Sequence, residues 1–168
     1  MLFRSTGPLY TNWEGPPPED DGRSRPFVAA ANVGVFATPT DPPAVPDGLL
    51  SVDAAFADDV LAKEHRPYLL WTFGKSPDLV IEIVSNREGD ELGGKRLQYR
   101  RLHIPHDVVG KLVGYLGDPG RYVFELRGDL YVRRTEATSP CLGLGRALWN
   151  GPFEGVCHAL ASVGGRAG

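Results

Sequence analysis

Apolar and polar positions follow an informative order over residues 77–85, where the chain reads PDLVIEIVS. Side chains alternate across a strand, so the face that carries Glu82 also carries Val80 and Val84, while leucine and isoleucine fill the other face. Both faces are mainly apolar, which predicts a central strand covered on both sides. An ionised carboxylate there is costly unless it is paired, hydrogen-bonded or bound to a cation. Glu82 is therefore a candidate functional residue; the alternative is a salt bridge to a basic residue of a covering helix.

A helical stripe follows this strand, because Leu92, Lys95, Tyr99 and Leu102 are separated by three, four and three positions. Lys95 thus lies among residues expected to face the sheet, where lysine is rarely found without a partner. It either pairs with Glu82 or extends along apolar surface to the edge. Gly93–Gly94 allow a helix that begins only after them. The basic residues that fall off the stripe are expected to meet solvent: Arg96, Arg100 and Arg101.

The segments before Glu82 are shorter and are punctuated by proline and glycine. Residues 1–26 predict an irregular segment, and residues 27–38 predict one strand. A Pro-rich turn then leads into a strand with Asp47 at its head. Asp53 is a candidate N-cap for a short helix over 53–63, although its acidic content also allows a loop.

The C-terminal part predicts strands and turns. Tyr122–Leu126 and Leu130–Arg133 flank Arg127-Gly128-Asp129, which is typical of a β-hairpin. The run GLGRALWNGPFEG, residues 143–155, predicts an edge strand and a turn that close against the core. We expect a main domain over 27–157 and a flexible tail over 158–168.

Composition adds a few limits to this picture. A chain of 168 residues is long enough for one domain with a real core. The net charge of -3 does not favour a nucleic-acid binder, although basic residues cluster over 95–103 as either a solvated helix face or a phosphate-contacting patch. Cys141 and Cys157 are too few and too far apart to define a metal site or a disulfide scaffold. We see no signal peptide and no membrane-spanning run, so a cytoplasmic protein without a membrane partner is expected.

The candidate chemistry comes from two strand carboxylates and one lysine. Pro46-Asp47 heads one apolar run, and Glu82 lies within another. Together with Lys95 on the following helix, these residues make a plausible site for a divalent metal and phosphodiester chemistry.

The same residues carry a family resemblance. The runs VPDGLLSVD, PYLLWTFGKSPDLVIEIVSN and REGDELGGK, with Tyr99 after them, resemble the Uma-two family of bacterial endonucleases, whose core is of the PD-(D/E)xK type. The resemblance resumes in RYVFELRGDLYV and LGLGRALWNGPFEG. It implies an α/β restriction-endonuclease-like fold, with a mixed central β-sheet flanked by helices and a C-terminal β-hairpin.

The resemblance also implies roles for single residues. Asp47 and Glu82 resemble the two metal-binding carboxylates of the nuclease core. The core motif would place its lysine at Val84, and in this family Lys95 on the next helix takes that role. Mg²⁺, or alternatively Mn²⁺, would be held by these carboxylates and the Ile83 carbonyl. Supporting contacts around Lys95 are expected from Glu91, Gln98 and Tyr99.

Two functions remain open from the sequence. The first is a metal-dependent DNA endonuclease, as a monomer or as a homodimer. The second is a catalytically silent nuclease fold that acts as a dimerising or DNA-associated interaction module. A small ligand-binding domain with a buried ion pair between Glu82 and Lys95 is a third interpretation. The family's N-terminal helix has no counterpart here, since no amphipathic helix fits residues 1–26, so weak cleavage favoured by manganese is expected.

Overall fold

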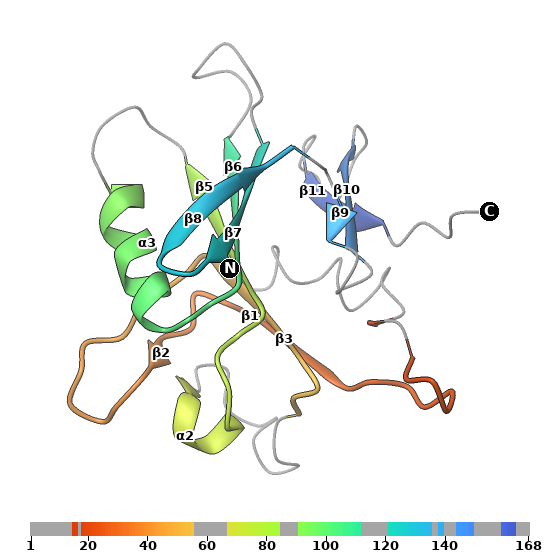
Figure 1. Cartoon of the computed structure of the whole chain (residues 1–168), viewed down its shortest axis with the longest axis horizontal. Coiled ribbons are helices and arrows are strands. Elements are labelled where there is room, and N and C mark those ends of the chain that lie inside the picture. The colour runs from red at the N-terminus through yellow and green to blue at the C-terminus, as the bar shows by residue number, and fades with distance from the viewer. Residues whose placement is uncertain are drawn as a thin grey trace.

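A computed structural model describes residues 15–16, 18–55, 67–84, 91–111, 121–135, 138–139, 144–149 and 159–163. Its largest element is a six-stranded sheet in the order β1-β3-β5-β6-β7-β8 (Figure 1). The strands are β1 (Phe27–Ala31), β3 (Gly48–Val52), β5 (Leu79–Val84), β6 (His106–Lys111), β7 (Arg121–Arg127) and β8 (Leu130–Arg134). β5 and β6 run parallel, and the other neighbouring strands run antiparallel. The expected α/β class with a mixed central sheet is therefore confirmed.

The other described elements are small. The helices are α2 (Leu70–Phe73) and α3 (Glu91–Arg101). A two-stranded parallel sheet pairs β2 (Val35–Phe36) with β4 (Tyr68–Leu69). A three-stranded sheet contains β9 (Thr138–Ser139), β10 (Leu144–Trp149) and β11 (Ala159–Val163). Neither described helix has the length and apolar character needed to cross a membrane.

The large sheet is apolar on both faces, as the pattern of β5 predicts. One face forms a core cluster with Leu79 of β5, and its buried members are Ala29, Leu50, Val52, Leu79, Val108 and Val123. The other face carries Val80 and packs against α3 through Tyr99 and Leu102. Figure 1 shows α3 lying alongside this sheet. We call the second face the α3 face, and it is the face that carries Glu82.

The strand register fixes which side chains are neighbours on the α3 face. One row across the sheet contains Leu49, Val80, Asp107, Phe124 and Arg133. The adjacent row contains Glu82, Val109 and Tyr122. Because the register of β3 and β5 pairs Gly48 with Ile81, its continuation by one position sets Asp47 opposite Glu82.

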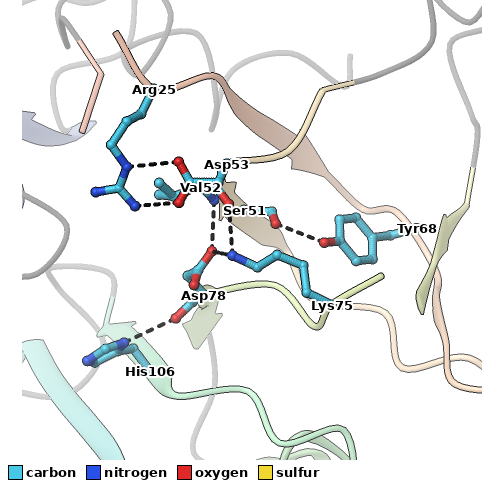
Figure 2. Close-up of polar contacts among 8 residues, drawn as sticks. All are labelled: Arg25, Ser51, Val52, Asp53, Tyr68, Lys75, Asp78 and His106. Atoms are coloured by element: carbon cyan, nitrogen blue, oxygen red, sulfur yellow. Dashed lines mark hydrogen bonds and ion pairs between the residues drawn. The ribbon is translucent and has the colours of Figure 1, made fainter. Parts of the chain in front are cut away.

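A polar cluster ties the far end of β3 to the start of β5 (Figure 2). Asp78 accepts hydrogen bonds from the Lys75 ammonium at 2.6 Å and from the Val52 amide at 2.8 Å. Lys75 also donates to the Val52 carbonyl at 2.8 Å. His106 of β6 contacts the Asp78 carbonyl through Nδ1 at 3.1 Å. This cluster satisfies backbone groups where the two strands end, at a distance from Glu82 along β5.

Two expectations for the N-terminal half are wrong. Residues 27–38 form two strands, because Asn32 adopts a left-handed conformation with φ 52° and breaks the run. Asp53 has φ 55°, whereas an N-cap residue usually has β-region angles. Its carboxylate instead pairs with Arg25, whose Nε donates at 2.8 Å. The rest of the expected helix, from residue 56, lies outside the described residues.

The expectations for the C-terminal half have different outcomes. The hairpin of β7 and β8 is confirmed, and Gly128 in its turn has φ 60°, which favours glycine. β10 is not an edge strand, since it lies between β9 and β11 in its own sheet. β11 falls in the segment expected to be a flexible tail and pairs with β10 over Ala159–Val163.

Candidate functional site

Glu82 is the centre of a hydrogen-bonded cluster between β5 and α3. Glu82 is only 3% exposed to solvent. The Lys95 ammonium donates to Oε2 at 2.6 Å, and the Tyr99 hydroxyl donates to Oε1. Each carboxylate oxygen therefore has a donor, which offsets part of the cost of burying the charge.

The geometry of α3 explains how Lys95 and Tyr99 reach the same carboxylate. Residues four apart lie one above the other on a helix face. Tyr99 is fully buried against the sheet, whereas the Lys95 side chain keeps 35% of its surface exposed. The expected pairing of Lys95 with Glu82 is confirmed as a contact. Gly93 and Gly94 lie inside α3, so the helix does not begin after them, and Lys95 is not in its first turn.

Asp47 approaches the same position from β3. Its Oδ2 accepts a hydrogen bond from the Ile83 amide at 2.7 Å. This contact joins Asp47 to the residue directly after Glu82, in agreement with the register that sets the two carboxylates opposite each other. Directly opposite residues have Cβ atoms about 4.5–5.5 Å apart. The two acidic groups are therefore close neighbours on the α3 face.

The electrostatics of Glu82 reflect opposing influences. Burial raises the pKa of its carboxyl, and it is the largest influence; the hydrogen bonds from Lys95 and Tyr99 act against it, and the charge of Asp47 adds to the rise. Burial also raises the pKa of Tyr99, with Glu82 adding to the effect, so this hydroxyl remains a donor across the physiological range. The repulsion between Asp47 and Glu82 is the smallest of these influences, and a cation between the two carboxylates would relieve it.

The structure adds a second ion pair that the sequence prediction missed. Arg96 was expected to meet solvent, but its Nε donates to Asp107 Oδ2 at 2.9 Å and its guanidinium lies 3.6 Å from the Phe124 ring centroid. Asp107 is fully buried in β6. The signal that singled out Glu82, an isolated carboxylate inside an apolar strand, is also present in HDVVGK, residues 106–111.

The other predicted site residues are placed as follows. Ile83 contacts the site through its amide, and the predicted use of its carbonyl as a metal ligand stays a prediction. Gln98 is exposed on α3, and the Glu91 side chain lies outside the described part of the chain. Within the described residues there is no group of three or more histidine, cysteine, aspartate or glutamate side chains arranged to hold a metal.

The donor chemistry nevertheless fits a hard divalent cation. Asp47, just before β3, and Glu82 of β5 supply carboxylate oxygen atoms, and Mg²⁺ prefers oxygen ligands and binds with few carboxylates and several waters. The Lys95 ammonium already pairs with Glu82, so a divalent cation at these carboxylates would have to displace the ammonium or share the site with it.

Comparisons with known proteins give no relative: no family model matches the sequence, and no curated protein or solved structure matches the chain.

Proposed function

We propose that this chain is a metal-dependent DNA endonuclease with a restriction-endonuclease-like core, as its motifs' resemblance to the Uma-two family implies. The observation that supports the proposal is that Lys95 donates to Glu82 at 2.6 Å, while Asp47 accepts from the amide of the next residue, Ile83, at 2.7 Å. Glu82 and Lys95 come from β5 and α3, and Asp47 is the residue just before β3, more than 30 positions earlier in the chain.

Each residue has a separate role in this proposal. Asp47 and Glu82 would hold Mg²⁺ or Mn²⁺, which supplies charge stabilisation for phosphodiester hydrolysis. Tyr99 fixes the Glu82 carboxylate by donating to Oε1, while Oε2 accepts the hydrogen bond from the partly exposed Lys95 side chain. Lys95 ends at the partly exposed side of the cluster, where its ammonium can stabilise negative charge that develops on a scissile phosphate.

A plasmid-nicking assay with Mg²⁺ or Mn²⁺ tests the proposal. Wild type should nick weakly and better with Mn²⁺, which a given ligand set holds more tightly. Lys95→Ala and Glu82→Gln should lose most of this activity. Lys75→Ala is a matched control, because Lys75 also forms a 2.6 Å ion pair and its side chain is 33% exposed, but it lies in the cluster of Figure 2. Equal nicking by all variants would indicate a contaminant and refute the assignment.

Metal binding can be measured separately from cleavage. Ligands that bind only the native state raise the melting temperature by mass action. Mg²⁺ or Mn²⁺ should therefore raise the melting temperature of wild type, and Glu82→Gln should abolish the increment. An unchanged increment in Glu82→Gln would place the cation elsewhere.

A second candidate is a catalytically silent module that dimerises. It is favoured by the pairing of both Glu82 oxygens within the protein. It is also favoured by β8, which ends the six-stranded sheet and exposes Leu130 and Val132. Dimerisation in light scattering, with neither nicking nor a metal-dependent melting shift, would favour this module over the nuclease.

A further inference from the structure

Asp107 has a buried oxygen without a hydrogen-bond donor. Its side chain is fully buried, and Oδ2 accepts the Arg96 hydrogen bond at 2.9 Å. Oδ1 accepts no hydrogen bond from any residue within the described ranges. Buried carboxylate oxygens are normally paired, because an unpaired one keeps the cost of losing water. The proposed nuclease roles do not use this group.

The register places Asp107 beside the candidate site. Val80 pairs with Asp107, and Glu82 pairs with Val109, so Asp107 and Glu82 are diagonal neighbours on the α3 face. Diagonal neighbours in a sheet lie within reach of long side chains. Both strands are covered by α3, which contributes Lys95 to one carboxylate and Arg96 to the other.

The Lys95 ammonium acts on both acidic groups. Burial raises the pKa of the Asp107 carboxyl, while the Arg96 hydrogen bond and the charges of Arg96 and Lys95 oppose the rise. Lys95 therefore interacts electrostatically with Asp107 while it is hydrogen-bonded to Glu82 Oε2.

A cation at the Asp47–Glu82 pair would compete with Lys95. Tyr99 and Lys95 each donate to one oxygen of Glu82, so a cation at this carboxylate would lie close to the ammonium. Like charges repel, so the cation would weaken the hydrogen bond between Lys95 and Oε2 and favour a second acceptor for Lys95. Its flexible side chain, 35% exposed, is able to move.

We propose that Asp107 is a positioning residue whose Oδ1 accepts the Lys95 ammonium when a divalent cation occupies the Asp47–Glu82 pair. Arg96 holds Oδ2 and so keeps Oδ1 in place for this exchange. Lys95 then remains beside the cation instead of moving into bulk water. This inference rests on the proposed metal site and assigns a function to the unpaired oxygen.

The ammonium signals of lysine in a ¹⁵N NMR spectrum provide a direct test, because an ammonium is visible only while it is protected from exchange with water. The chain has four lysines, at positions 63, 75, 95 and 111, and Lys95→Ala assigns the relevant signal. In wild type the Lys95 signal should shift but persist as Mg²⁺ is added. In Asp107→Asn it should be present without Mg²⁺ and disappear at saturation. The Lys75 signal is the internal control and should not change.

A double-mutant cycle on Mg²⁺ affinity, measured by calorimetry, separates positioning from general damage. Asp107→Asn should weaken binding roughly tenfold, the size of one charge-assisted hydrogen bond. In the Lys95→Ala background the same change should alter binding less than about twofold, because no ammonium needs the second acceptor.

The outcomes distinguish this inference from the proposed function. If wild type binds no Mg²⁺, the metal site and the inference both fail. If wild type binds Mg²⁺ but its Lys95 signal disappears at saturation, or if Asp107→Asn has equal effects in both backgrounds, the inference fails alone. If Asp107→Asn does not fold, the wild-type Lys95 signal decides the matter by itself.

Discussion

Tyr99→Phe is the sharpest test of how the buried carboxylate is held. The change removes one hydroxyl from a fully buried ring and leaves its packing nearly unchanged. It leaves Glu82 Oε1 without the donor that it has now. A hydrogen bond to a charged group contributes about 1.5–3 kcal/mol, so the free energy of unfolding at neutral pH should fall by about that amount. For a chain of this size the melting temperature should fall by roughly 3–10 °C.

The loss should depend on pH with a definite sign. Burial already raises the folded-state pKa of Glu82 above its ordinary value of 4.5, and the hydrogen bond from Tyr99 opposes that rise. Removing the hydroxyl raises the folded pKa further. A carboxyl with a raised folded pKa loses stability as pH rises through that pKa, because the folded state binds more protons than the unfolded state. The difference between wild type and Tyr99→Phe should therefore be smallest below pH 4.5 and largest above both folded pKa values.

Urea unfolding across a pH series measures this difference, and Tyr131→Phe is the matched control. The Tyr131 hydroxyl donates to the Ile104 carbonyl at 2.6 Å, which is a neutral acceptor. Its loss should cost about 0.5–1.5 kcal/mol, with no dependence on pH around the Glu82 titration. A Tyr99→Phe loss that is equally independent of pH would refute the argument that Tyr99 holds an ionised carboxylate.

Two further predictions concern residues of the fold outside the candidate site. Asp78→Ala should lower the free energy of unfolding by about 1–3 kcal/mol, because it leaves the Val52 amide without its acceptor. Asp78→Asn keeps an acceptor and loses only the ion pair with Lys75, so its loss should be smaller. Equal losses of the two variants in urea unfolding would contradict this. Gly94→Ala should stabilise the protein by about 0.5–1 kcal/mol, because Gly94 lies within α3 and an added Cβ meets nothing within 4 Å. Gly128→Ala should destabilise it by about 1 kcal/mol, because Gly128 has φ 60°. Melting curves of both variants test these opposite signs.

The parts of the fold that were predicted correctly follow from the periodicity of apolar side chains within single elements. The alternation around Glu82 and the stripe through Lys95 and Tyr99 depend only on residues close together in the chain. The hairpin at Gly128 depends on one turn whose backbone angle favours glycine. These signals locate an element and its inward face, which is why the contact between Lys95 and Glu82 was predictable.

The parts that failed depend on how one element packs or pairs with another. The helix stripe placed Arg96 toward solvent, because one helix's period cannot give the position of the helix over the sheet. The partner of Arg96 is Asp107, which lies on the next strand and so outside the pattern of the helix. The three-stranded sheet also depends on the register between strands, since Trp149 pairs with Ala159, and the sequence pattern contains no measure of that register.

The candidate site is mostly the product of one β–α–β unit. β5 supplies Glu82, β6 supplies Asp107, and the intervening helix α3 supplies a cation for each. Lys95 and Arg96 are consecutive, and consecutive helical side chains diverge by about 100°. They therefore reach carboxylates on two neighbouring strands and not the same one. Asp47 is the exception, since it arrives from β3 and depends on antiparallel pairing with β5. The contact of Lys95 with Glu82 is thus built into the β–α–β unit, whereas the position of Asp47 depends on the pairing of β3 with β5. Variants that loosen β3 should therefore lose cation binding before they lose the pairing of Glu82 with Lys95.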